Sequence, residues 1–148
     1  PLKSVSGRFF EPDKDITLGE AVKLAFDIMD YHEYGSEYMA SAAKIGLISY
    51  SDAAAEDELC TREKAIAMAA ALYGKKTGSK LSYTGFASSI YVDLNQVRPD
   101  LLPKVMFAVE NGLCVSTGSN YLSPGDYITR GEMAAILEKV LALSGELE

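Results

Sequence analysis

Apolar residues recur at helical spacing behind three separate threonines of this 148-residue chain. They stand 4, 7, 8 and 11 residues after Thr17, Thr61 and Thr129. The residues are Ala21, Leu24, Ala25 and Ile28; Ala65, Met68, Ala69 and Leu72; and Met133, Ile136, Leu137 and Val140. An apolar stripe of this kind lies on one face of an α-helix and has to be buried. The pattern therefore predicts three amphipathic helices, each headed by a threonine.

The threonines are expected to begin these helices. Thr129 and Glu132 have the S/T-x-x-E form of a capping box. In that arrangement the threonine hydroxyl accepts a hydrogen bond from a first-turn amide, and the glutamate accepts one from the threonine amide. Thr17 with Glu20 opens a similar segment, and Thr61 opens a third. We therefore expect the three threonines to cap helices rather than to bind a ligand.

Glycine, proline and the apolar spacing predict the remaining elements. The sequence predicts helices over residues 17–30, 36–45, 61–73, 99 or 100–111 and 129–143, and a short helix or strand over 87–92. Gly46 and Gly112 are expected to end the second and fourth helices. Residues 113–115 and 127–128 are predicted to pair as a two-stranded ribbon. The Gly- and Lys-containing stretch 74–85 is predicted to be a linker.

The segments that flank the threonines also correspond to one another. Residues 44–48 precede the second threonine much as residues 110–114 precede the third, and residues 9–12 precede Ile16 as residues 121–124 precede Ile128. We therefore predict one domain over residues 1–148 with a partial unit at 1–30 and further units at 31–73 and 86–146. Units too small to bury their own apolar face are typical of repeat architectures.

Composition and charge exclude several classes of protein. The chain is 48% hydrophobic and 24% charged, which is ordinary for a globular domain. It has no apolar run near the roughly 20 residues that span a bilayer. The formal charge of −7 argues against nucleic-acid binding, which depends on clustered Lys and Arg. The chain shows no signal peptide and starts at Pro1, so we expect a processed or excised piece of a longer protein.

The residues that usually carry catalysis or bind metals are scarce. Cys60 and Cys114 stand where other units have isoleucine, which predicts two buried thiols, with a disulfide as the alternative. There is no C-x-x-C motif, and His32 is the only histidine, so neither a metal nor a cofactor is expected. No G-x-S-x-G motif or marked carboxylate pair is present. The sequence therefore predicts a protein that is not an enzyme.

Read together, these motifs make the third unit similar to the S-layer homology (SLH) repeat. That repeat begins with aromatic-x-Asp, continues through a helix to Gly-apolar, and ends on an I-T-R-A-E-type helix after a loop with aromatic-x-Pro. The matching residues are Tyr91-Val92-Asp93, Val105, Ala108, Gly112-Leu113, Gly118, Tyr121, Pro124 and Ile128-Thr129-Arg130-Gly131-Glu132. The resemblance covers about the last 55 residues. The second unit keeps Thr61-Arg62-Glu63, whereas the first has Leu18 in place of the arginine.

The resemblance implies a fold and a function. The expected fold is mainly α, a three-repeat pseudo-threefold helical spindle with short β-like segments between the helices. The expected function is a secreted, cell-surface module that anchors its parent protein to the cell wall. In this family the ligand is secondary cell-wall polysaccharide with a pyruvylated sugar, bound in grooves between repeats. The alternative is a structural, protein-interaction or self-assembly module of the same fold that binds no glycan.

The family's binding residues can be carried over only where the motifs match. The ligand-binding residues that the resemblance implies are Arg62, Arg130, Asp93, Gly112, Gly118, Glu132 and Tyr91. An arginine can hold a ketal carboxylate through two hydrogen bonds. An intramolecular carboxylate, such as that of Asp93 or Glu132, is the alternative partner for either arginine. Leu18 should disable the first groove, and the incomplete first unit leaves a homo-oligomer as one way to cover an exposed apolar face.

Overall fold

The structure, a computed structural model, describes residues 11–29, 35–114 and 119–145 and is mainly helical there. The α-helices are α1 (Leu18–Ile28), α2 (Tyr38–Lys44), α3 (Arg62–Thr77), α4 (Leu102–Glu110) and α5 (Arg130–Leu143). Short 3₁₀ helices lie at η3 (Tyr50–Asp52), η4 (Phe86–Ser89) and η5 (Leu94–Gln96). The predicted mainly α fold class is confirmed.

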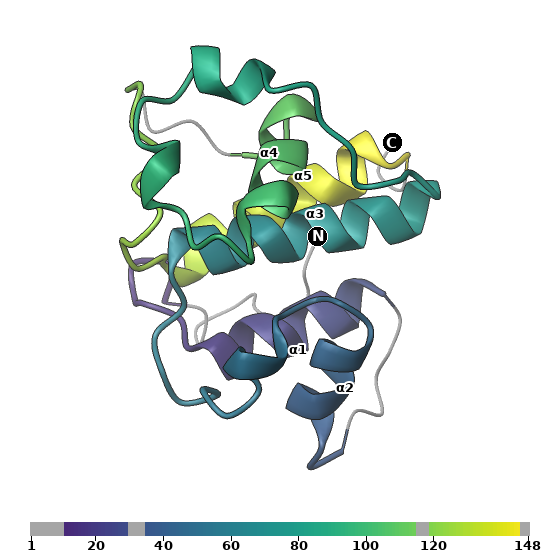
Figure 1. Cartoon of the computed structure of the whole chain (residues 1–148). Helices are drawn as coiled ribbons and strands as arrows, with labels where there is room; N and C mark the ends of the chain where they lie inside the picture. Colours follow the sequence, from purple (N-terminus) through teal and green to yellow (C-terminus); the bar gives the residue numbers. More distant parts are fainter. Residues whose placement is uncertain (1–10, 30–34, 115–118, 146–148) are drawn as a thin grey trace.

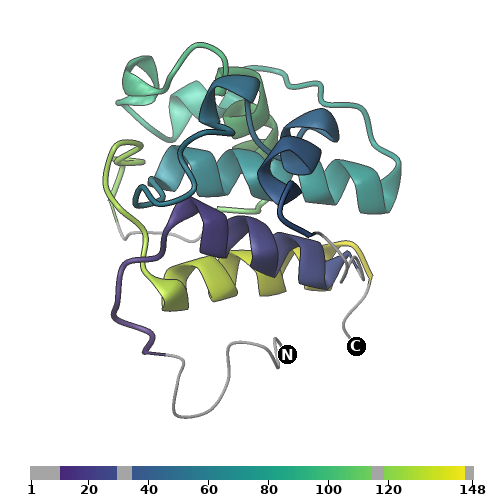
Figure 2. The ribbon, with the colours of Figure 1, turned by 90° about the horizontal axis from the view of Figure 1, so that it is seen from below.

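Helix α3 lies at the centre of the packing. It contacts α4 on one side and α5 on another, and α1 packs against α2, α5 and α3 (Figure 1). The view from below shows α1 and α5 side by side (Figure 2). Helix α3 is buried on almost all faces. Its run of small residues fits this position, because neighbouring helices that approach closely leave little room for large side chains. All three predicted apolar stripes are buried.

Two of the three threonines cap their helices as predicted. The hydroxyls of Thr17 and Thr129 accept from the amides of Glu20 and Glu132, and both glutamates bond back to the threonine amides. Thr61 makes no such bond, and its Oγ1 is buried without a partner in the structure. The prediction that its hydroxyl caps the helix is therefore wrong at this position. Thr61 still stands at the N-cap of α3, and Lys64, in the place of Glu20 and Glu132, cannot accept a hydrogen bond from the threonine amide.

The residues just before the three threonines form a closed ring of backbone hydrogen bonds. Ile16 N donates to Ile128 O at 3.1 Å, Cys60 N donates to Ile16 O at 2.8 Å, and Ile128 N donates to Cys60 O at 3.0 Å. All three residues are fully or almost fully buried. Each segment therefore donates to one neighbour and accepts from the other.

Beside this ring, two further backbone hydrogen bonds occur at the start of each of the three threonine-headed helices. The first turn of each threonine-headed helix donates two amides to carbonyls of a neighbouring loop. These bonds join Leu18 N to Glu58 O, Arg62 N to Asp126 O, Arg130 N to Lys14 O, Gly19 N to Glu56 O, Glu63 N to Pro124 O and Gly131 N to Pro12 O, at 2.8–3.0 Å. Amides at a helix start have no partner within the helix. The neighbouring segment supplies that partner at three equivalent positions.

Two predictions of local structure need correction. The ribbon between 113–115 and 127–128 is wrong, because Tyr127 bridges to Thr61 and Ile128 bonds to Cys60 and Ile16 instead. Val115 lies outside the described residues. Helix α3 also continues to Thr77, past the predicted end at residue 73, and stops at the left-handed Gly78.

The α5 surface differs from that of the other two threonine-headed helices. Helix α2 packs against α1, and α4 packs against α3. Nine residues after each threonine stand Phe26, Ala70 and Glu138; Phe26 and Ala70 are buried, whereas Glu138 is exposed. Helix α5 thus carries a solvated charge at a position that is covered in α1 and α3. Self-association through an incomplete first unit stays a prediction.

Candidate functional site

Arg62 and Asp93, both predicted ligand-binding residues, hold the same peptide of the protein. Asp93 is 4% exposed, and its two carboxylate oxygens accept from Leu122 N at 2.8 Å and Ser123 N at 2.9 Å. Arg62 is 6% exposed, and its Nε donates to Leu122 O at 2.8 Å. Ser123 has a positive φ of 55°, which a serine rarely adopts without such support. The two side chains therefore fix the loop before α5.

Tyr91 and Cys114 lie next to this pair. Burial raises the pKa of the Tyr91 hydroxyl, and the nearby Cys114 and Asp93 raise it further while Arg62 lowers it. Cys60 and Cys114 are free thiols, and burial raises the pKa of their sulfurs to about 12 and about 11. The buried-thiol prediction is confirmed for Cys60, while Cys114 is half-buried. Both thiols are poor nucleophiles because little thiolate forms.

Arg130 and Glu132 lie at a different boundary, where α5 meets α1. The Arg130 guanidinium donates from one of its terminal nitrogens to Glu20 Oε2 at 2.6 Å, and its side chain is 18% exposed. Burial alone would raise the pKa of Glu20, but the hydrogen bonds from Thr17 and Arg130 lower it overall. Glu132 is exposed and serves the capping box of Thr129. The structure thus separates Arg130 from the Arg62–Asp93 cluster.

The predicted glycines occupy turns after helices. Gly112 has φ 74° and ends α4, and Gly46 has φ 86° and follows α2 at the equivalent position. A side chain would strain either backbone, because L-residues avoid this region. Gly118 lies outside the described residues. Gly46 was not among the predicted site residues, although its segment aligns with that of Gly112.

A paired ionic cluster joins the loop after α2 to the loop before α4. Arg98 binds Asp100 through two nitrogens, at 3.0 and 2.6 Å, and Asp52 at 2.9 Å. Lys64 lies 3.5 Å from Asp52, which is buried. The Arg98 hydrogen bond, with help from Ser49, lowers the pKa of Asp100 to about 2. These charges satisfy one another, so the cluster is structural.

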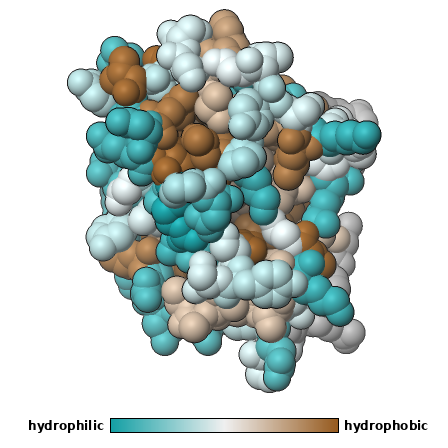
Figure 3. All heavy atoms as spheres, viewed as in Figure 1, coloured by the Kyte–Doolittle hydropathy of each residue, from teal (hydrophilic) through white to brown (hydrophobic). Residues whose placement is uncertain are grey.

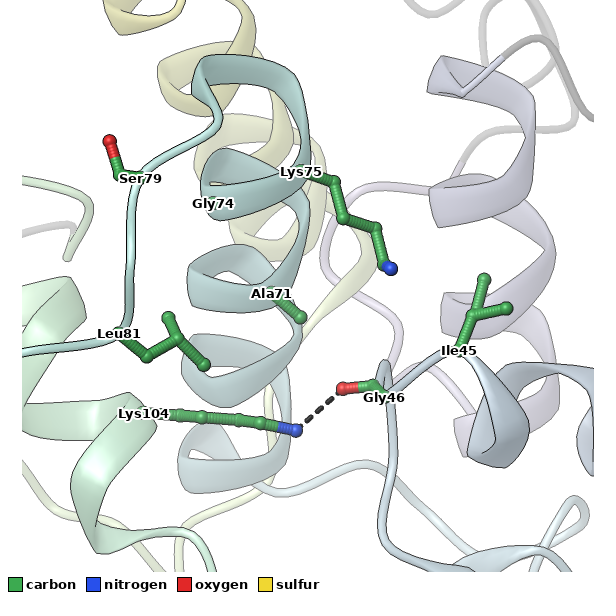
Figure 4. Close-up of a pocket in the computed structure, with 8 residues that line it drawn as sticks. All are labelled: Ile45, Gly46, Ala71, Gly74, Lys75, Ser79, Leu81 and Lys104. Carbon is green, nitrogen blue, oxygen red and sulfur yellow. Dashed lines mark hydrogen bonds between the residues drawn. The ribbon is translucent and has the colours of Figure 1, made fainter.

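A pocket of about 270 Å³ opens beside α3. Figure 4 shows the middle of α3 as its back wall, with the chain after α3 on one side and the turn after α2 on the other. It is lined by Ile45, Gly46, Ala71, Gly74, Lys75, Ser79, Leu81 and Lys104. Gly74 has no side chain to block the returning chain, and a Cβ there would lie 3.3 Å from Ser79 O. The pocket therefore lies where α3, α4 and the turn after α2 meet.

The pocket is cationic on an otherwise acidic protein. Its only charged lining residues are Lys75 and Lys104, and no carboxylate is among those described. Lys104 Nζ donates to Gly46 O at 2.5 Å, across the floor of the pocket in Figure 4. Burial lowers the pKa of Lys104, Asp100 opposes this, and the like charge of Lys75 adds to it. An anion placed between the two ammonium groups would relieve this repulsion.

Other chemistry has little support in the described part of the chain. No group of three His, Cys, Asp or Glu side chains is arranged there to hold a metal ion. None of the helices in the described ranges has the length and apolar character needed to cross a membrane. The pocket around Lys75 and Lys104 is a candidate ligand site in this part of the chain.

Comparison with known proteins identifies part of the chain. Residues 102–134 match the family model of the S-layer homology domain, from the start of α4 into α5. No curated protein matches the chain. SLH domains are cell-wall-binding, non-catalytic modules, so the match associates the chain with the cell surface and with cell-wall anchoring. Residues 102–134, which carry Gly112, Arg130 and Glu132, are therefore similar to an S-layer homology repeat.

Proposed function

We propose that this module anchors its parent protein by binding an acidic, pyruvylated cell-wall polysaccharide in the pocket of Lys75 and Lys104. The observation that carries the proposal is a pair of lysines in a pocket whose described lining contains no carboxylate. Two ammonium groups in a lining without a carboxylate favour an anionic group. Because the net charge of −7 repels anions at long range, this attraction has to act locally.

The apolar part of the lining suits a pyruvate ketal. Ala71, Leu81 and Ile45 face the same space as the two ammonium groups in Figure 4. A pyruvate ketal carries a methyl group and a carboxylate on one carbon, so it presents an apolar and an anionic group side by side. A pocket that combines aliphatic side chains with lysines can hold both. Gly46 lets the ligand approach the turn closely.

Arg130 is our candidate for a second contact with the polysaccharide. Its guanidinium is partly exposed and already holds a carboxylate, that of Glu20. A ligand carboxylate could take the place of Glu20 without leaving the arginine unpaired. Arg62 does not fit this role, because it is buried and its Nε is bonded to Leu122 O.

Lys104→Gln is expected to weaken binding of purified pyruvylated wall polysaccharide by about 1.5–3 kcal/mol, the range for a hydrogen bond to a charged group. Glutamine keeps most of the aliphatic stem and a polar NH₂ group, so the fold should persist while the charge is lost. Titration calorimetry would measure the affinity, and Lys75→Gln and Arg130→Ala would be compared in the same assay. Thermal unfolding would check that each variant is folded.

The matched control is Lys139→Gln, which removes the same charge from an exposed position on α5. Polysaccharide from which the ketal has been hydrolysed provides the second control. If Lys139→Gln and Lys104→Gln lost the same polysaccharide affinity, the effect would be one of net charge alone, and the pocket would be refuted as the binding site. Self-association without any retention of the polysaccharide would favour the alternative, a structural module.

The affinity should also fall at alkaline pH. The pKa of Lys104 is lowered in the free protein, and a bound carboxylate would raise it again. At a pH where Lys104 is neutral in the free protein, the ligand can therefore bind well only if Lys104 takes up a proton, which costs affinity. The affinity should therefore decline as the pH rises through the free pKa, which lies below the usual value of about 10.4. Lys104→Arg should make the profile flatter at alkaline pH, because arginine stays protonated. The same decline in both proteins would contradict this assignment.

A further inference from the structure

Residues 79–92 expose large apolar side chains in one continuous stretch. They belong to the connection from α3 to α4, residues 78–101, whereas residues 29–37 suffice to connect α1 to α2. Leu81, Tyr83, Phe86, Ile90 and Val92 are all exposed, Tyr83 by 44% and Phe86 by 60%. In Figure 3, hydrophobic atoms gather in the upper half of the face, the part where Figure 1 shows this segment. The extra length thus adds exposed apolar surface to the molecule.

The segment is held in this exposed position by α4. Both carboxylate oxygens of Glu110, at the end of α4, accept from the segment's amides: Thr84 N at 2.8 Å and Gly85 N at 2.8 Å. These backbone hydrogen bonds lower the pKa of Glu110. Ala87, one residue after Phe86, is fully buried. Tyr83 and Phe86 are therefore presented on a fixed backbone on either side of the Glu110 contact.

The exposed aromatic residues follow the pocket lining in sequence. Leu81 lines the pocket, and Tyr83 and Phe86 follow two and five residues further along the same segment. A polymer with one sugar in the pocket would extend along this path. We propose that Tyr83 and Phe86 form a stacking subsite for the neutral sugar rings next to the acidic one, an inference that rests on the proposed function.

The chemistry of the segment fits a polysaccharide better than a protein. The apolar residues alternate with small polar ones and a lysine: Ser79, Lys80, Ser82, Thr84, Ser88 and Ser89. The centres of protein interfaces are depleted in serine and lysine. A pyranose ring presents C–H groups on its face and hydroxyls at its edge, so it can use both kinds of residue. Its C–H hydrogens meet the negative face of an aromatic ring.

The test compares Tyr83→Ser/Phe86→Ser with wild type on three probes: a methyl glycoside carrying a pyruvate ketal, the pyruvylated polysaccharide, and the same polysaccharide after removal of the ketal. Affinity for the glycoside should be unchanged. Affinity for the pyruvylated polysaccharide should fall roughly tenfold, the effect of two aromatic contacts. Weak retention of the ketal-free polysaccharide should persist in Lys104→Gln and disappear in the double variant.

The control is Tyr50→Ser, at a tyrosine that is 75% exposed on η3. Equal polysaccharide affinity of wild type and the double variant would overturn the subsite and leave the pocket standing. Failure of wild type to bind the glycoside would instead refute the pocket, and the ketal-free polysaccharide would then decide the subsite alone. If the double variant sedimented as a smaller species than wild type and kept the same glycan affinity, the subsite would be overturned in favour of a protein interface.

Discussion

Replacing Asp93 with alanine should lower the free energy of unfolding by about 3–5 kcal/mol, because two hydrogen bonds to a charged group are lost and buried amides are left unpaired. Asp93 accepts from Leu122 N and Ser123 N, and Leu122 is fully buried. The loop that it holds supplies the carbonyls of Pro124 and Asp126 to the start of α3. Urea unfolding would measure the loss.

The matched control is Asp126→Ala, at an exposed aspartate of the same loop, which should change stability by less than about 0.5 kcal/mol. Asp93→Asn should fall between the two, because an amide keeps one acceptor oxygen. The resemblance to SLH repeats places Asp93 in the ligand site instead. If Asp93→Ala kept its stability and lost only glycan affinity, that role would replace the structural one.

The helices were largely predictable because their signals are local. The stripes behind Thr17, Thr61 and Thr129 are buried, and the two complete S/T-x-x-E patterns form capping boxes. The pattern fails where one member changes. Lys64 stands in the glutamate position of the second unit and pairs with Asp52 instead.

The pairing of distant segments was not predictable in the same way. The ribbon prediction assumed that Ile128 pairs with a neighbour in sequence, because hairpins are the commonest short-range pairing. The structure pairs it with Cys60 and Ile16. An isolated bridge involves too few residues to leave a period in the sequence. The equivalence of the three threonines was the signal that could have indicated a shared partner.

In the candidate site too, local residue types could be predicted from the sequence, whereas the proximity of distant residues could not. Lys75 and Lys104 come from the last turns of α3 and the first turn of α4, with no motif to connect them. Their proximity depends on how α4 packs against α3 and on the space left at Gly74. Sequence resemblance instead selected Arg62, which the second unit shares with the family motif, and the structure buries it. A motif predicts a residue type, whereas its exposure is decided by packing.

The ring of Ile16, Cys60 and Ile128 leads to the second large effect. Because each of the three segments is hydrogen-bonded to both others, a substitution that weakens the packing of one segment should loosen its contacts with the other two. Ile16→Ala and Ile128→Ala should each cost about 2–5 kcal/mol, the range for truncating a buried isoleucine. The two losses should be similar, although the residues lie at opposite ends of the chain.

Urea unfolding with a single transition and an unchanged m-value would show that the three segments unfold together. Tyr127→Ala is the control, since that side chain is 57% exposed and only its backbone takes part in the bridge to Thr61. A much smaller loss for Ile16→Ala than for Ile128→Ala would mean that α1 separates from α5 before the rest unfolds. In that case the Arg130–Glu20 pair would break in the same early step.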